Sequence, residues 1–247
     1  MRPVTRLLCC LLLLPLASVA RADVTAGARA KEQGRPLLYV AVGPHATHAL
    51  LGTLHIKDTR VSAPHPLVEV ALSRADELVA EVDFDNTASM GLWIRGQLPR
   101  NRPLNTLLSA ALKERIEALL TRSHRSLETM QRIKPWLVEH HIAELLAPKA
   151  TRDTSFLDER LQQAARELGT SVVGLETSEE QTSILDDYPL KVQVERLEET
   201  VRLVEADLQN GTNAVEDMIQ AWLSGDPKRL MAEVHRYFDF GIEQHRE

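Results

Sequence analysis

Residues 171–181, SVVGLETSEEQ, contain a strand-forming run that is followed at once by the start of a helix. The valines between Ser171 and Leu175 favour a short strand. Ser178 and Gln181 fit a capping box, in which each side chain accepts a hydrogen bond from a backbone N–H group of the other residue. A strand that runs directly into a helix is typical of an α/β fold.

Three further strands are predicted upstream. Residues 36–42 and 48–55 are rich in valine and leucine, and a turn at residues 43–47 separates them, so together they predict a hairpin. Residues 77–82, ELVAEV, predict the third strand, and residues 171–175 are then the fourth.

Helical periodicity fills the rest of the chain. Between the third and fourth strands, one helical face is marked by Leu104, Leu108, Leu112, Ile116 and Leu119. Residues 136–146 and 156–168 predict two more helices, and Gly169 ends the second.

Apolar residues between Leu190 and Leu208 recur at intervals of three and four, which predicts a long helix. This helix packs on its own domain or pairs in an intermolecular coiled coil. We expect this long helix to end at Asn210-Gly211, and a last helix begins near Pro227. We therefore expect an α/β fold with a small mixed sheet, a large helical insertion between strands three and four, and a helical C-terminal part.

Residues 1–22 have the pattern of a secretory signal peptide. Arg2 and Arg6 precede an apolar run, and Ala20-Arg21-Ala22 has the small residues of a cleavage site. The alternative is a signal that is retained as an anchor. The apolar run is too short to cross a bilayer comfortably, and no later stretch is long enough.

We therefore expect an exported protein, periplasmic in a Gram-negative bacterium and otherwise secreted, with no stable membrane span after cleavage. Residues 23–35 are polar and small, and they predict a flexible segment. Residues 36–247 are then expected to form the folded domain.

Charge and composition exclude several classes of function. The chain carries a net charge of −6, and its signal segment removes three arginines and no acidic residue, so nucleic-acid binding is not expected. Aromatic residues make up only 4%, too few for a base-stacking surface. Cys9 and Cys10 both lie in the signal segment, which leaves the exported protein without disulfides, thiol nucleophiles or zinc–thiolate sites.

Three ionisable residues share one position in the predicted topology. His55 closes the second strand, Glu81 lies near the end of the third, and Glu176 directly follows the fourth. Ligands of open α/β sheets bind outside the carboxyl ends of strands. One imidazole and two carboxylates would suit a divalent ion such as Mn²⁺ or Zn²⁺.

Each residue also has a structural interpretation. His55 would end its strand by donating a hydrogen bond to a backbone carbonyl. Glu81 would be one of the polar residues that alternate with apolar ones along a half-exposed strand. Glu176 would favour the helix that follows it. Spacing along the chain does not by itself bring the three together.

The signatures of other enzyme classes are absent from the sequence. It has no G-x-S-x-G, no P-loop, no G-x-G-x-x-G and no H-E-x-x-H. Glu139, His140, His141 and Glu144 lie near one helical face, but the two glutamates are interpreted as solvated charges.

Several sequence blocks, in this order, resemble the TraB/GumN family, to which the Tiki-type metalloproteases belong. The first is LLGTLHIKD at residues 50–58, which matches a G-x-x-H strand. Next come ALSRADELVAEVD at residues 71–83, Leu157-Asp158 with Gly169, and GLETSEEQ at residues 174–181. Ala221-Trp222 with Gly225-Asp226 completes the resemblance, which covers roughly residues 36–235.

The resemblance implies an α/β fold with a metal-dependent hydrolytic centre built from paired G-x-x-H histidines and a glutamate. It assigns His55 and Glu81 to a site for Mn, Co or Zn, with Glu81 as ligand or general base. Glu176 is a second catalytic candidate in a family-typical segment.

The chain departs from the family at its C-terminal end. The family has a second G-x-x-H near its C-terminus, whereas residues 241–245, GIEQH, have one residue too many. We therefore expect the domain to be C-terminally incomplete, with an exposed sheet edge.

Two functions follow as hypotheses. The first is an exported scaffold of the metallopeptidase type, a hydrolase that acts on a peptide or protein substrate. The alternative is a non-catalytic binding protein that uses the same cleft.

Overall fold

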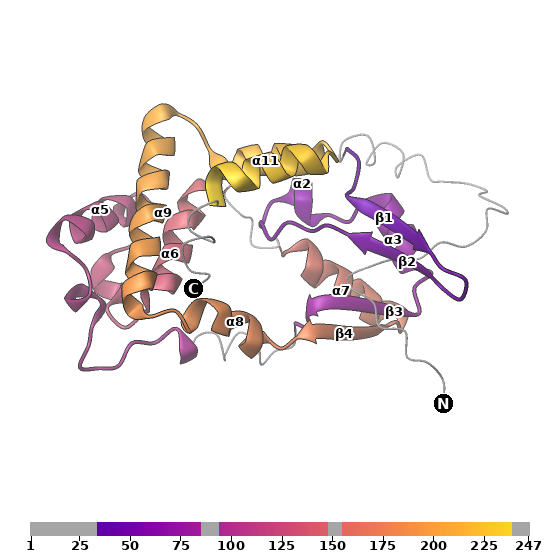
Figure 1. The fold of residues 1–247 in the computed structure, drawn as a ribbon, viewed down its shortest axis with the longest axis horizontal. Coiled ribbons are helices and arrows are strands. Elements are labelled where there is room, and N and C mark those ends of the chain that lie inside the picture. Colours follow the sequence, from indigo (N-terminus) through magenta and orange to yellow (C-terminus); the bar gives the residue numbers. More distant parts are fainter. Residues whose placement is uncertain (1–33, 85–93, 148–154, 239–247) are drawn as a thin grey trace. The chain divides into compact units, whose positions relative to one another are not determined.

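The structure, a computed structural model, describes residues 34–84, 94–147 and 155–238. These residues form a mixed α/β protein with a helical insertion between the third and fourth strands and a helical C-terminal part, so the predicted fold class is confirmed (Figure 1). The predicted signal peptide and the block at residues 241–245 lie outside the described residues.

The strands are β1 (Leu38–Val42), β2 (Thr47–Leu51), β3 (Glu77–Val82) and β4 (Ser171–Glu176). The α-helices are α2 (Thr59–Ser62), α3 (Pro66–Leu72), α5 (Ala110–Thr121), α6 (Pro135–Ala143), α7 (Leu157–Leu168), α8 (Ser178–Asp186), α9 (Leu190–Asn210), α10 (Ala214–Leu223) and α11 (Pro227–Phe238). Short 3₁₀ helices span Leu104–Thr106, Leu127–Met130 and Glu144–Leu146.

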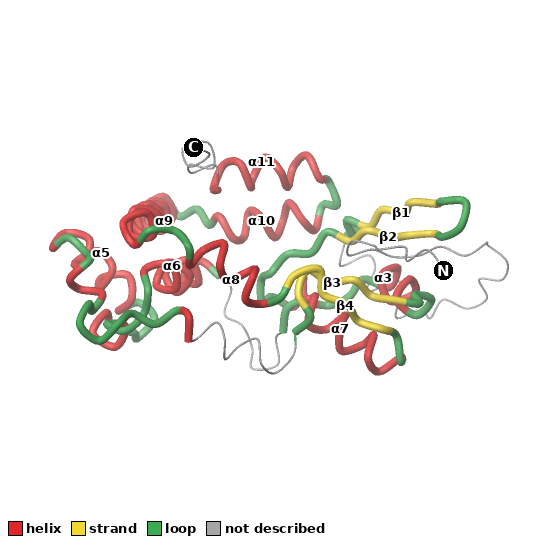
Figure 2. Tube along the Cα trace, turned by 60° about the horizontal axis from the view of Figure 1, so that its bottom comes forward, coloured by secondary structure: helices red, strands yellow, loops and turns green. Residues whose placement is uncertain are grey.

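The strands form two pairs, one of each kind (Figure 2). β1 and β2 make the predicted antiparallel hairpin, in which Leu38 lies opposite Leu51. β3 and β4 are parallel, with Glu77 beside Ser171 and Val82 beside Glu176. Parallel strands require a long crossover connection, and the helical insertion provides it.

The chain divides into two compact units. Of the described residues, 34–84, 155–176 and 217–238 belong to one unit, which holds both strand pairs. Residues 94–147 and 177–216 belong to the other unit, which is helical. Leu112, Ile116 and Leu197 are among the fully buried residues of this helical unit.

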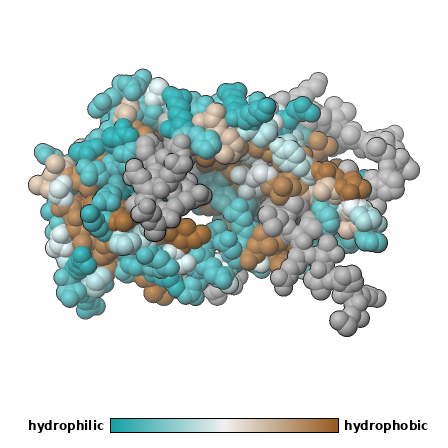
Figure 3. All heavy atoms as spheres, viewed as in Figure 1, coloured by the Kyte–Doolittle hydropathy of each residue, from teal (hydrophilic) through white to brown (hydrophobic). Residues whose placement is uncertain are grey.

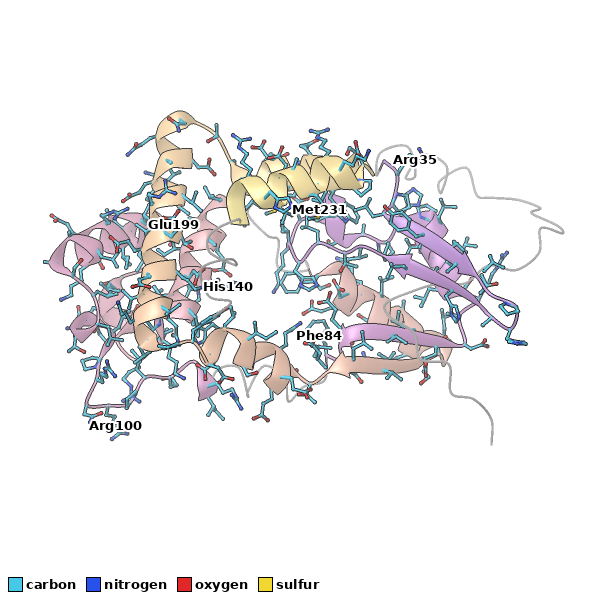
Figure 4. The ribbon with its side chains drawn as sticks, in the orientation of Figure 1. Arg35, Phe84, Arg100, His140, Glu199 and Met231 are labelled. Atoms are coloured by element: carbon cyan, nitrogen blue, oxygen red, sulfur yellow. The ribbon has the colours of Figure 1, made fainter. Side chains whose placement is uncertain are left out.

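Helix α7 covers the parallel strand pair, as both ribbon and tube show (Figures 1 and 2). Gln162 of α7 fastens the end of β3, since its Nε2 donates to the Val82 carbonyl at 2.8 Å. Its Oε1 accepts from the backbone N–H of Phe84 at 2.9 Å, just beyond the strand (Figure 4). The buried Gln162 side chain therefore holds the end of β3 against α7.

Gly174 allows the two parallel strands to meet closely. A Cβ atom at this position would lie 2.8 Å from the backbone nitrogen of Asp83 and 3.1 Å from the Glu176 carbonyl oxygen. The neighbouring atoms are backbone, so they have little freedom to move away. Glycine at this point of β4 is therefore a packing requirement.

The hairpin exposes several apolar side chains (Figure 3). Tyr39 and Leu50 lie directly opposite one another and are 50% and 44% exposed, while Val42 is 75% exposed. Ala49 and Leu51 are buried against the rest of their unit. Within the described residues, β1 pairs with β2 alone, which leaves its other edge without a strand.

The helix predicted from residue 104 begins later. Ser109 is its N-cap, with a hydroxyl that accepts from the backbone N–H of Leu112 at 3.1 Å, so α5 starts at Ala110. Leu104 lies in a separate 3₁₀ turn. The predicted apolar residues are nevertheless all buried, because the turn and the helix face the same core.

The capping box of α8 lies one residue earlier than predicted. Thr177, not Ser178, is the N-cap, and its hydroxyl accepts from the Glu180 N–H at 3.1 Å. Glu180 in turn accepts from the Thr177 N–H at 2.8 Å. The extended backbone of Thr177 makes it the last residue outside the helix.

None of the helices in the described part of the chain combines the length and the apolar character needed to cross a bilayer.

Candidate functional site

The loop after β2 carries the candidate site. The strand ends at Leu51, so His55 lies in this loop and does not close the strand as the sequence predicted. Two hydrogen bonds of the Gly52 backbone hold the start of the loop. Its N–H donates to the Leu37 carbonyl at 2.9 Å, and its own carbonyl accepts from the Trp222 indole N–H at 3.0 Å.

Two consecutive tight turns shape this loop. The Ile56 N–H donates to the Leu54 carbonyl at 2.8 Å, and the Asp58 N–H donates to the Ile56 carbonyl at 2.9 Å. Each bond closes a three-residue γ-turn, centred on His55 and on Lys57. Neither residue has a positive φ, so both turns have the common inverse form. We refer to residues 52–58 as the γ-turn loop.

Alternate side chains of the γ-turn loop reach the N-terminal turn of α7. The Thr53 hydroxyl donates to Asp158 Oδ1 at 3.0 Å, and His55 Nε2 lies 3.3 Å from Asp158 Oδ2. The Lys57 ammonium lies 4.8 Å from the centroid of the Phe156 ring. Phe156 and Asp158, at the N-terminal end of α7, therefore contact three residues of the loop.

Asp158 anchors the site because its carboxylate is buried. Its side chain is only 8% exposed, whereas that of His55 is 47% exposed. Oδ2 is buried and has no hydrogen-bond partner in the described structure, and the imidazole, whose Nε2 lies 3.3 Å away, is the polar group that faces it. A buried carboxylate with no polar or cationic group beside it would destabilise the fold. The imidazole is therefore expected to stay beside Asp158.

The pair shifts the protonation of both members. The polar contact with Asp158 raises the pKa of His55, burial opposes this, and the negative charges of Asp158 and Glu81 add to the rise. Burial alone would raise the pKa of Asp158, but the contacts with His55 and Thr53 outweigh it and lower that pKa. The protonated imidazole and the ionised carboxylate therefore stabilise each other.

Glu81 lies near this pair. Glu81 is an exposed residue of β3, and its charge contributes to the raised pKa of His55. Gln162 ties the end of β3 to α7, the helix that bears Asp158. The structure thus brings two of the predicted residues, His55 and Glu81, into one electrostatic environment.

Glu176 does not join them. The parallel register places Glu176 beside Val82, the residue after Glu81. Successive residues of a strand point to opposite faces, so Glu81 and Glu176 leave the strand pair on opposite sides. The register therefore brings Glu176 beside Val82 and not beside Glu81, so the structure does not group Glu176 with the other two residues.

Few of the described side chains are arranged as metal ligands. In residues 34–84, 94–147 and 155–238, no group of three or more histidine, cysteine, aspartate or glutamate side chains is placed to hold a metal ion. His55 and Glu81 are suitable donor types, but catalytic zinc sites use three protein ligands. Asp158 is not a free third ligand, since Thr53 and His55 occupy both of its oxygens.

Patterns in the sequence assign no functional role to Thr53, Lys57, Phe156 and Asp158. Leu157-Asp158 belongs to the family resemblance, which is the available signal. An acid in the first turn of a helix is ordinarily favoured by the helix dipole, so the pattern does not reveal a distant imidazole. The pairing across the fold is a tertiary property.

The polar group on α6 lies in the helical unit and forms its own contacts. Glu144 accepts from Arg125 at 3.1 Å, and its contact with His141 contributes most to a pKa lowered to about 2. The prediction that Glu139 is a solvated charge is wrong, because its side chain is mostly buried beside Arg196 and Thr200. His140, on the same helix, is 64% exposed (Figure 4).

The fold and the site define a mixed α/β protein whose ionisable centre is a histidine held by a buried carboxylate. The sequence profile of the TraB/PrgY/gumN family matches residues 37–246. The chain belongs to this family, as its ordered sequence blocks indicated. Comparison with curated proteins gave no match, and comparison with solved structures gave none either.

Proposed function

We propose that this member of the TraB/PrgY/gumN family is an exported hydrolase of the peptidase type, with its active centre at His55 and Glu81. The observation that carries the proposal is the contact between His55 and the buried Asp158. A histidine oriented by a carboxylate is a recurrent arrangement for proton transfer.

The two nitrogens of the imidazole have different roles in this proposal. Nε2 faces Asp158 Oδ2 at 3.3 Å, so in the neutral ring the proton is favoured on Nε2. Nδ1 then keeps its lone pair for a proton or a ligand. The 47% exposure of the side chain leaves the ring accessible to a substrate.

A divalent ion, Mn, Co or Zn, is proposed to bind through His55 and Glu81, although these two donors do not complete a site. When bound, such an ion would lower the pKa of a coordinated water and polarise a carbonyl group. The residues themselves supply the orientation of the imidazole through Asp158 and a negative charge through Glu81. Glu176 has no role in the proposal, because it leaves the opposite face of the strand pair.

Metal binding is tested by calorimetry with Mn²⁺, Co²⁺ and Zn²⁺ on the full chain. The His55→Ala variant is expected to lose measurable binding of at least one ion. His45→Ala is the matched control, because His45 lies exposed in the hairpin turn of the same unit. Equal affinity in the parent chain and in His55→Ala would contradict the metal proposal.

Hydrolysis is tested with a peptide library, with and without added metal. We expect cleavage that depends on metal and is lost in Glu81→Gln, whereas Glu176→Gln retains it. Failure to cleave any peptide, combined with intact ligand binding, would favour the second function.

That second function is a non-catalytic binding protein using the same loop. The observation in its favour is that no group of three or more histidine, cysteine, aspartate or glutamate side chains in the described residues is placed to hold a metal ion. Peptide binding without turnover under every metal condition would establish it.

Export is a separate part of the proposal and rests on the signal pattern of residues 1–22. In a Gram-negative host we expect the protein in the periplasmic fraction with Asp23 as its first residue. Recovery of an uncleaved chain from the membrane fraction would overturn this.

A further inference from the structure

Lys57 occupies the second γ-turn of the loop, two residues after His55. Its side chain is exposed, and its ammonium lies over the Phe156 ring at 4.8 Å from the centroid. Phe156 also flanks His55, with ring centroids 6.1 Å apart. One aromatic ring therefore lies beside both the imidazole and the ammonium.

No carboxylate within the described ranges of the chain lies at ion-pairing distance from Lys57. Asp58, the next residue along the chain, and Asp158, the partner of His55, each contact other groups. Asp58 binds the Arg60 guanidinium through bonds of 2.8 and 2.9 Å and also caps α2. Asp158 binds Thr53 and His55.

The contact with Phe156 orients the ammonium without neutralising its charge. An aromatic face attracts a cation through its quadrupole but carries no net charge, so the ammonium keeps its positive charge. The amine can still donate three hydrogen bonds to an incoming anion. The loop thus presents an oriented, uncompensated cation next to the candidate active centre, on a chain of net charge −6.

We propose that Lys57 binds a carboxylate of the peptide ligand that occupies the site at His55. This inference rests on the proposed function, because it assumes that the ligand lies at His55. It adds the substrate class, namely peptides with a carboxylate close to the reacting bond. The Phe156 ring provides apolar contact for the part of the peptide between these two points.

The spacing limits where this carboxylate lies. His55 and Lys57 are two residues apart, so their Cα atoms are separated by no more than about 7 Å. An extended peptide rises about 3.3 Å per residue. The carboxylate therefore belongs to the C-terminus or to an acidic side chain within about two residues of the bond that faces His55.

Binding of three short peptides to the full chain tests the proposal, by calorimetry without added metal. The probes are acetyl-trialanine with a free C-terminus, the same peptide as its amide, and acetyl-Ala-Asp-Ala amide. The free acid and the aspartyl peptide distinguish a terminal from a side-chain carboxylate. The neutral amide is the reference for contacts that need no charge.

The variants distinguish the effect of the Lys57 charge from the effect of its side-chain packing. Lys57→Met keeps the length of the side chain and removes its charge, whereas Lys57→Arg keeps the charge. Lys228→Met is the matched control, because Lys228 is exposed on α11 in the same unit and away from the γ-turn loop in sequence. Circular dichroism checks that each variant is folded.

We expect at least one carboxylate peptide to bind about tenfold more tightly than the neutral amide, which is the range for a hydrogen bond to a charged group. Lys57→Met should abolish this preference, and Lys57→Arg and Lys228→Met should retain it. Equal binding of all three peptides, or a preference that survives in Lys57→Met, would overturn the inference. Because the readout is binding, absence of catalysis would leave the result interpretable.

Discussion

His55 and Asp158 form an ion pair in which imidazole Nε2 lies 3.3 Å from carboxylate Oδ2. His55 belongs to the loop after β2, whereas Asp158 lies in the first turn of α7. The exposed imidazole is thus tied to a buried carboxylate from a distant part of the chain, and Thr53 donates to the other oxygen. This contact determines the charge and the orientation of the proposed active centre.

The first prediction concerns the pKa of His55. Asp158→Asn removes the negative charge that raises this pKa, so the value should fall from above about 6.5 toward or below it. NMR titration of the histidine ring protons measures the change. Asp76→Asn, a change of an acid in the same unit that has no contact with His55, should leave the titration unchanged. An unaltered titration in Asp158→Asn would show that the pair does not form.

The second prediction concerns the pH dependence of stability. Because the pKa of His55 is raised, its contribution is complete below about pH 6.5 and is lost as the pH rises through the folded-state value. Because the pKa of Asp158 is lowered, its contribution is present above about pH 4 and is lost on acidification. The pair is therefore most stabilising between about pH 4 and 6.5.

Urea unfolding at pH 5 and pH 8.5 tests this window. The difference in unfolding free energy between the parent chain and Asp158→Asn should be larger at pH 5. Asp58→Asn is the control, since the partner of Asp58 is an arginine that stays charged at both values. A difference for Asp158→Asn that does not vary with pH would refute the prediction.

The third prediction concerns the anchor of the γ-turn loop. Trp222→Phe keeps an aromatic ring but removes the N–H that donates to the Gly52 carbonyl at 3.0 Å. We expect a loss of about 1 kcal/mol in unfolding free energy and a change in the His55 titration. Trp136→Phe removes a similar bond, to Asp186 at 3.0 Å in the helical unit, and should leave that titration intact. If His55 titrates identically in both variants, the Trp222 hydrogen bond does not influence the site and the prediction is wrong.

The fourth prediction concerns the parallel strand pair. Gly174→Ala places a methyl group 2.8 Å from the Asp83 backbone nitrogen, so the strands must separate locally. We expect a destabilisation of about 1–3 kcal/mol, measured by thermal unfolding. Gly174→Ala with parent-like stability would show that β3 and β4 meet less closely than described.

Much of the secondary structure could be predicted because its signals are local. The apolar period and Gly169 predicted the helix at residues 156–168, and Gly169 indeed ends α7 with a φ of 76°. The strand at residues 77–82 was also predicted from its composition. Boundaries were less accurate where neighbouring residues compete as caps, as Thr177 and Ser178 do.

The sequence by itself determined the order of strands and helices, the family and the choice of His55 and Glu81 as candidates, because each depends on residues close together in the chain. Only the tertiary structure decided that Asp158 holds His55 and that Glu176 leaves the opposite face from Glu81. Those two outcomes depend on strand register and on how α7 packs, and both are set by contacts between segments far apart along the chain. A local sequence pattern predicts which face of a helix or strand a residue occupies, but it does not predict which distant residue that side chain contacts.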